Sequence, residues 1–265
     1  RRLRNFVRCN FTTGRTCLRC LKGWLEGLSG IQDKTMELAH DGPLAIPLWI
    51  NGRACLTVGN QLFDVVNPVT GVAKHRVPLC GAEESAQALA AARDAAAIWT
   101  GLGLSGRQDK LAQLATALEG YSGHFAKLLM ADRGVAQADA EAEVVAAVQV
   151  LRADQLGQSG VLGLVVGAER PLLAAAKVAP ALLAGATVVI KPSPKAPSAA
   201  FALCELASRC EFPAGVLNVL HGDGPAIEGL CTAGADALLF AGAAGLRGPV
   251  AELAARNATH FVVVN

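Results

Sequence analysis

The sequence predicts an α/β protein with a parallel, doubly wound sheet flanked by helices. Two observations support this fold class. In the second half of the chain, short apolar segments alternate with helical patterns, as they do in βαβ units. Each apolar segment has the length and composition of a buried strand. The strands are expected at residues 161–166, 186–191, 216–220, 236–240 and 260–264, and the helices near residues 172–184, 197–210, 225–233 and 247–256.

Residues 1–48 differ from the rest, because they are basic and show weak periodicity. We expect an irregular basic extension or linker here. The cysteines of this segment are Cys9, Cys17 and Cys20. They do not indicate zinc, since a structural site requires four ligands and His40, the nearest further candidate, lacks finger-like spacing. A redox Cys-x-x-Cys pair is not expected either, because no thioredoxin-like βαβ unit surrounds it.

A short hairpin is expected from Trp49 to Gly52, because an Asn-Gly pair between extended residues favours a tight turn. An alternating strand follows from Leu62 and closes on a Pro-Val-Thr-Gly turn at residues 68–71. Helical spacing then predicts four helices. They are expected at residues 83–99, from an N-cap at Ser105 to about Leu118, at residues 125–132 and at residues 138–151.

The stretch Gly160–Ser193 is the most informative part of the chain. An apolar strand is followed by a turn and by an Ala/Leu helix that ends at Gly185. A second apolar strand then closes on Lys191-Pro-Ser. Together these pieces predict one complete βαβ unit.

Several motifs, in this order, resemble the aldehyde dehydrogenase superfamily. Trp-Ile-Asn-Gly and Asn-Pro-Val-Thr-Gly resemble its entry motifs, while Gly160–Ser193, Phe212–Val219 and Phe240–Gly242 resemble its cofactor domain. The resemblance covers residues 49–265 and implies an incomplete N-terminal, cofactor-binding domain. The chain most resembles the non-catalytic second domain of the family 16 aldehyde dehydrogenases, in which two such domains lie in tandem. The resemblance therefore implies a fragment of such a protein.

The resemblance assigns no catalytic residue to this chain. In the family, a cysteine thiolate attacks the aldehyde and a glutamate activates the hydrolytic water. The Gly-Gln-x-Cys and Glu-Leu-Gly-Gly segments that supply them do not occur in these 265 residues. Glu169 also stands where the family's Pro-Trp-Asn-Phe-Pro turn has the asparagine that holds the oxyanion. Since a carboxylate repels a developing oxyanion, the chemistry is expected to be lost.

Lys191 is the first candidate for cofactor binding, at the carboxyl end of a predicted strand, where open α/β sheets bind ligands. The resemblance implies that it contacts the adenosine ribose of NAD or NADP. Pro194 replaces the acidic residue that binds the same sugar in the family, whereas Ser193 still offers a hydroxyl. Residual nucleotide contact is slightly favoured over the alternative, a solvated lysine at a strand end.

Two glycine turns complete the candidate site. Gly222 and Gly224 follow a strand and precede a helix, where glycines let the backbone approach a ligand, although a simple tight turn is equally favoured. Gly242 lies where the family has Phe-Thr-Gly-Ser-Thr, whose hydroxyls meet the cofactor pyrophosphate. Alanine replaces all three hydroxyl residues, so a well-packed turn is favoured there. NAD or NADP binding is expected to be weak or absent, and no metal is expected.

Composition excludes several classes of partner. A net charge of +2 gives no reason to expect nucleic acid. The most apolar run, residues 178–190, is too short for a membrane span and contains Pro180 and Gly185. No signal peptide is expected, since the basic start is followed by a polar stretch at residues 10–14. The scattered cysteines are typical of a reduced, cytoplasmic protein.

The remaining charged residues are given no function. The pairs Glu83/Glu84 and Glu141/Glu143 are expected on solvated helix faces. The single histidines are His75, His124 and His260. Between Arg152 and Gly160 there are too few residues for the hairpin that builds dimers and tetramers in the family, so that oligomerisation mode is not expected.

Two functions stay open. The first is a pseudoenzyme, a structural or interaction module that packs against a protein partner or a sister aldehyde dehydrogenase domain. The second is part of an NAD(P)-dependent aldehyde dehydrogenase whose catalytic half lies beyond Asn265. The chain does not begin with Met and stops directly after the apolar residues 261–264, so we expect a fragment in either case.

Overall fold

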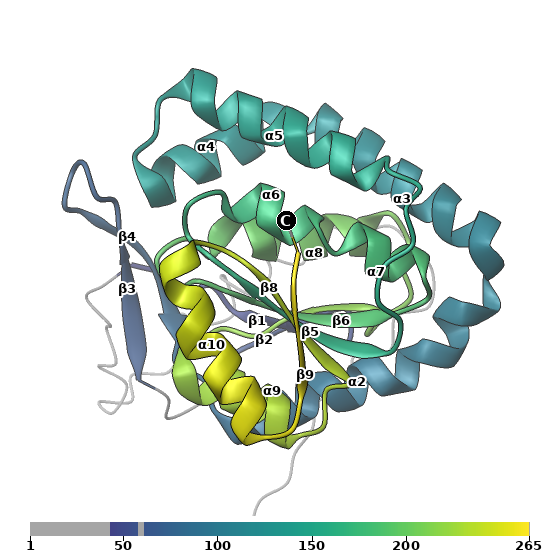
Figure 1. Cartoon of the computed structure of the whole chain (residues 1–265). Helices are drawn as coiled ribbons and strands as arrows, with labels where there is room; N and C mark the ends of the chain where they lie inside the picture. Colours follow the sequence, from purple (N-terminus) through teal and green to yellow (C-terminus); the bar gives the residue numbers. More distant parts are fainter. Residues whose placement is uncertain (1–42, 58–60, 265) are drawn as a thin grey trace, which may run out of the picture. The chain divides into compact units, whose positions relative to one another are not determined.

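The computed structural model describes residues 43–57 and 61–264 (Figure 1). Cys9, Cys17, Cys20 and His40 lie outside these residues, as does most of the expected basic extension. The strands are β1 Leu48–Ile50, β2 Arg53–Cys55, β3 Leu62–Val66, β4 Ala73–Pro78, β5 Val161–Val166, β6 Thr187–Pro192, β7 Leu217–Val219, β8 Ala237–Ala241 and β9 His260–Val263. The helices are α2 Ala82–Gly101, α3 Gly103–Gly120, α4 Ser122–Arg133, α5 Gln137–Leu151, α6 Pro171–Ala176, α7 Ala179–Leu183, α8 Ser198–Arg209, α9 Gly224–Thr232 and α10 Ala244–Arg256.

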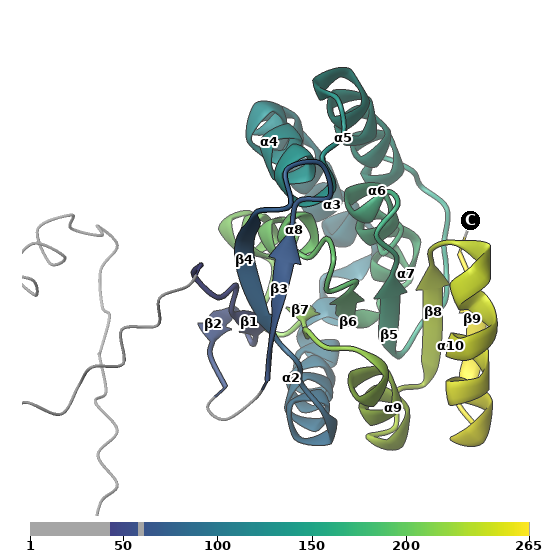
Figure 2. The ribbon, with the colours of Figure 1, turned by 90° about the vertical axis from the view of Figure 1, so that its left-hand side faces the viewer.

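The main sheet of the described chain confirms the predicted fold class. Its strand order is β2-β1-β7-β6-β5-β8-β9, and the strands from β7 to β9 are parallel (Figure 2). The predicted hairpin at Trp49–Gly52 forms β1 and β2, which add an antiparallel edge through β1 and β7. Strands β3 and β4 pair separately as a two-stranded sheet. Residues 153–159, between α5 and β5, contain no strand or helix.

Helices cover both faces of the sheet, with α3 to α8 on one side and α2, α9 and α10 on the other (Figure 1). Side chains of β5 alternate between the two sides: Leu162 and Leu164 belong to one apolar cluster, whereas Val161 and Val165 belong to the other. All six residues of β5 are buried for this reason. An apolar strand without alternation is therefore the sequence signature of this doubly covered sheet.

Two predicted helix boundaries were wrong. The helix expected at residues 172–184 is divided into α6 and α7. Pro180 lies in the first turn of α7, and in a continuous helix its ring would clash with the carbonyl of Ala176, so the chain restarts at Ala179. Ser105 is not an N-cap, because it lies inside α3. Helix α3 follows α2 after the single residue Leu102, and Gly103 takes up the sharp turn at a φ of 68°.

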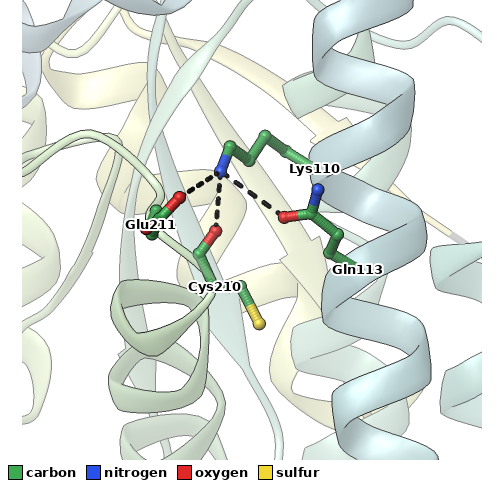
Figure 3. A network of polar contacts seen from close by, with 4 residues as sticks. All are labelled: Lys110, Gln113, Cys210 and Glu211. Carbon is green, nitrogen blue, oxygen red and sulfur yellow. Dashed lines mark hydrogen bonds and ion pairs between the residues drawn. The ribbon is translucent and has the colours of Figure 1, made fainter.

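A polar network joins helices that are far apart in the sequence. Lys110 of α3 donates to the carbonyl of Cys210, at the end of α8, over 3.0 Å (Figure 3). The same ammonium lies 3.4 Å from Gln113 Oε1 and 3.5 Å from the Glu211 carboxylate. A cation at a helix C-terminus satisfies carbonyls that have no partner within the helix and interacts favourably with the helix dipole. Lys110 therefore stabilises the position of α3 against α8.

Candidate functional site

A cleft of about 180 Å³ lies at the carboxyl ends of the parallel strands. Strands β6 and β7 lie on one side of β5, and β8 and β9 lie on the other, so the strand order reverses between β5 and β8. Ligands of open α/β sheets bind at such a reversal point. The cleft is lined by Lys191 and Ser193 from the end of β6, by Asp223 and Gly224 before α9, and by apolar side chains of α10.

Lys191 is buried rather than solvated at the strand end. Its side chain lines the cleft although the residue is only 3% exposed, and its Nζ donates to the carbonyl of Gly222 over 2.9 Å. Burial lowers the pKa of Lys191 to about 8, and the nearby charge of Asp223 opposes this shift. The cleft therefore contains an amine that can lose its proton close to neutral pH.

The shifted pKa of Lys191 predicts a specific pH dependence of stability. The folded protein binds fewer protons than the unfolded chain between about pH 8 and the usual lysine pKa, so its free energy of unfolding rises with pH in this window. His221 also lies near Lys191, and burial lowers its pKa to about 4, so its imidazole stays neutral in this pH window. Relative to Lys191→Met, the free energy of unfolding of the wild type should rise by about 2–3 kcal/mol between about pH 8 and pH 10.

Urea unfolding at both pH values tests this expectation. Lys195→Met is the matched control, because Lys195 is exposed in the loop directly after β6, the strand that carries Lys191. The control should follow the wild type across the pH range. An identical pH dependence of Lys191→Met and wild type would contradict the burial of the charge.

The other predicted site residues are only partly brought together. Ser193 and Gly224 line the cleft with Lys191. Gly222 lies behind Lys191 with a φ of 139°, and a Cβ there would come within 3.0 Å of the Cys80 carbonyl, so packing already explains this glycine. Gly242 is outside the cleft lining and approaches Gly167 so closely that a Cβ on Gly167 would lie 2.8 Å from the Gly242 Cα. Their roles in ligand binding stay predictions.

His221 is a neighbour of the site to which the sequence analysis gave no role of its own. It is 1% exposed, and its Nε2 lies 3.0 Å from the carbonyl oxygen of Pro47. Its Nδ1 has no hydrogen-bond partner among the described residues. The only signal in the sequence was its position directly after a buried strand. The contact ties the residues before β1 to the end of β7, beside the cleft.

Glu169 lies on the turn between β5 and α6, in a separate pocket of about 520 Å³. Phe63 and Val66 of β3 supply apolar walls of this pocket, and Arg133 and Lys195 also line it. Glu169 therefore lines this pocket and is not among the lining residues of the cleft that holds Lys191. A ligand that develops negative charge in this pocket would meet a carboxylate instead of an amide donor.

Glu143 corrects the expectation of a solvated helix face. It is 1% exposed, and its Oε1 accepts hydrogen bonds from the backbone N–H groups of Leu172 and Leu173, at 2.9 and 3.3 Å. Its Oε2 lies 2.8 Å from Arg133 Nη1. Desolvation raises the pKa of Glu143, although these partners favour the ionised form. Glu143 therefore caps α6, the helix that follows the Glu169 turn, whereas Glu141 is exposed as expected.

Comparison with known proteins identifies the family of this fold. The sequence profile described as the aldehyde dehydrogenase family matches residues 57–155 and 159–263, which is most of the described chain. The chain belongs to the aldehyde dehydrogenase family. This aldehyde dehydrogenase domain contains its candidate cleft within the second matched segment.

Curated relatives are enzymes of this family. Lactaldehyde dehydrogenase of Escherichia coli (strain K12) is 29% identical over 209 residues, which are 70% of this chain and 44% of the relative. A probable succinate-semialdehyde dehydrogenase [NADP(+)] of Sinorhizobium fredii is 33% identical over 198 residues, 65% of this chain and 40% of the relative. The chain thus spans less than half the length of these relatives.

Solved structures agree with this assignment. The crystal structure of lactaldehyde dehydrogenase from Escherichia coli superposes with a TM-score of 0.76 at 26% identity, covering 83% of this chain and 52% of that chain. Aldehyde dehydrogenase C from Pseudomonas syringae, solved with NAD+ and octanal, gives a TM-score of 0.75 at 26% identity and covers 83% and 50%. The fold of the described domain is therefore that of the family.

The start of α10 is the part of this aldehyde dehydrogenase domain that faces the end of β5. Its N-cap is Ala243, which provides no side-chain hydrogen bond to the helix. Gly242 and Ala244 are exposed beside it.

Among the described residues, no group of His, Cys, Asp or Glu side chains is arranged to hold a metal ion. None of the described helices is both long enough and apolar enough to cross a membrane.

Proposed function

We propose that this chain is an aldehyde dehydrogenase domain that binds NAD or NADP weakly and serves mainly as a structural or interaction module. The observation that supports this proposal is the chemistry of the turn Phe240–Ala244. Alanine stands at each of the three positions where the family resemblance places a hydroxyl for the cofactor pyrophosphate. Each lost charge-assisted hydrogen bond removes about 1.5–3 kcal/mol, so several losses shift micromolar affinity toward millimolar.

The size of the cleft supports weak binding as well. Ligand pockets usually have volumes of about 300–1,000 Å³, whereas this cleft has about 180 Å³. Its α10 wall consists of Leu246, Pro249, Val250 and Leu253. Lys191 is the cation at the cleft, and its Nζ already donates to Gly222. A dinucleotide would therefore find part of its contacts here and lack the polar groups for its phosphates.

Restoring hydroxyls at this turn is expected to strengthen nucleotide binding. In the double variant Ala243→Ser/Ala244→Thr, both changes fall at the partly or fully exposed start of α10, so the core stays undisturbed. Two added donors at a helix N-terminus should tighten NAD or NADP binding by about tenfold or more. Calorimetric titration and thermal shift with each nucleotide measure the gain.

Ala255→Ser is the matched control, since it adds a hydroxyl to an exposed position near the other end of α10 and should change nothing. Micromolar binding by the wild type, with no gain in the double variant, would overturn the proposal. A cooperative melt without any shift up to millimolar nucleotide supports the module. In that case, the search moves to protein partners.

The second candidate function is part of an active NAD(P)-dependent aldehyde dehydrogenase. It is favoured by the buried Lys191 at the cleft and by the superposition on enzymes of this class over 83% of the chain. Glu169 distinguishes the two candidates. In the enzyme that this second candidate describes, Glu169→Asn would restore an amide donor at the oxyanion position. Wild-type turnover of an aldehyde comparable with that of the Asn variant would favour the enzyme over the module.

We propose a cytoplasmic location and a protein partner for this domain. The partner we favour is a sister aldehyde dehydrogenase domain, as in the tandem arrangement of the family 16 proteins. A partner other than further copies of this chain is supported by residues 153–159, which form no strand where the resemblance implies an oligomerisation hairpin. Co-expression with a candidate sister domain, followed by sedimentation analysis of the complex, tests it. Wild-type tetramers of this chain alone would contradict it.

A further inference from the structure

Lys191 has properties that nucleotide contact does not require. Its Nζ donates to the Gly222 carbonyl over 2.9 Å, and Lys191 is one of the residues that line the cleft. Most of the surrounding surface is apolar, with Ile227 of α9, Phe240 of β8 and Val250 of α10 among the lining residues. Asp223 and Ser193 provide polar groups at the same cleft. This is a small, mostly apolar pocket with one amine.

We propose that Lys191 is a carbonyl-reactive site at which small apolar aldehydes condense with the amine to form a Schiff base. This inference is independent of nucleotide binding, because it requires only the cleft and its lysine. The volume of about 180 Å³ limits the reactant to a small molecule, and the aliphatic walls favour an uncharged one. The reactant class is therefore a short aliphatic aldehyde.

The reaction requires a neutral amine with access to the carbonyl carbon. Burial lowers the pKa of Lys191 to about 8, so a substantial fraction of its side chain is neutral near physiological pH. An ordinary lysine is almost fully protonated at that pH. A neutral amine retains two N–H bonds. One of them can stay on the Gly222 carbonyl while the lone pair attacks. Desolvation in an apolar pocket is a known route to a reactive lysine.

The step is balanced without an added oxidant or metal. The Lys191 nitrogen forms a bond to the aldehyde carbon, and the carbonyl oxygen takes up a proton, which gives a carbinolamine. The carbinolamine then loses one water to give the imine. Both hydrogens of the neutral amine leave in that water, with the former carbonyl oxygen. Hydrolysis reverses the reaction, so the site would hold an aldehyde reversibly.

Reductive trapping tests the proposal on the whole chain. The protein is incubated with butanal and sodium cyanoborohydride at neutral pH, which converts an imine into a stable butyl amine. Peptide mapping by mass spectrometry then compares Lys191 with the exposed lysines Lys74, Lys127 and Lys195 in the same sample. We expect Lys191 to be labelled at least about tenfold faster, as its larger neutral fraction predicts. Labelling of Lys191 at or below the exposed lysines would overturn the proposal.

Two controls make the result specific. Glyceraldehyde is similar in size to butanal but polar, so it should label Lys191 less than butanal does. The exposed lysines should show no such preference for butanal. Equal labelling of Lys191 by both would exclude selection by the apolar walls. Lys191→Arg keeps the charge and forms no imine, so the label should disappear without moving to the other cleft residues. Because the comparison among lysines is made in the wild type, it holds even if that variant fails to fold.

Discussion

Replacing Glu143 by alanine is expected to lower the free energy of unfolding by about 3–5 kcal/mol. The change removes two hydrogen bonds from the first turn of α6 and the ion pair with Arg133. The N–H of Leu172 is buried, so it would be left without a partner and without water. Urea or thermal unfolding of the purified variant measures the loss.

Glu141→Ala is the matched control on the same helix. Glu141 is exposed and accepts a surface hydrogen bond from Gln137 one turn earlier, so its replacement should lower the free energy of unfolding by about 0.5 kcal/mol or less. Glu143→Gln keeps an acceptor for the α6 N–H groups and avoids the cost of burying charge, so it should be milder than alanine. Equal losses for Glu141→Ala and Glu143→Ala would contradict the capping role.

Gly215→Ala is expected to cost about 3–5 kcal/mol. Gly215 lies in the turn before β7 with a φ of 90°, in the left-handed region that disfavours alanine. A Cβ there would also lie 2.3 Å from the carbonyl oxygen of Ala91, a backbone atom of α2. Since a helix backbone cannot move away without disturbing its own hydrogen bonds, the clash adds to the conformational strain. Denaturant unfolding gives the difference from wild type.

Gly71→Ala separates the two contributions. Gly71 has a φ of 67°, and nothing lies within 4 Å of a Cβ built on it. It should therefore show the conformational cost alone, about 1–2 kcal/mol. Equal destabilisation by Gly71→Ala and Gly215→Ala would contradict the close contact between Gly215 and the backbone of α2.

Glu141 and Glu143 also show where sequence reasoning stops. The two residues are alike in type and lie two positions apart on one helix, so the sequence suggested one environment for both. The ends of α6 and α4 meet at Glu143, and only their packing decides which carboxylate is buried. Local spacing does not encode where a distant helix begins. Lys191 is a similar case, because its burial depends on the chain around Gly222.

The sequence by itself determined the α/β class, the βαβ unit from β5 to β6 and the positions of the parallel strands. Hydrophobic periodicity and turn residues are local properties, so they can be recognised before any tertiary contact is known. The tertiary structure alone decided that α6 and α7 are separate, that Lys191 is buried with a lowered pKa, and that Gly242 lies outside the cleft lining. These features depend on which segments meet in space, and desolvation and steric contact act only after folding brings them together.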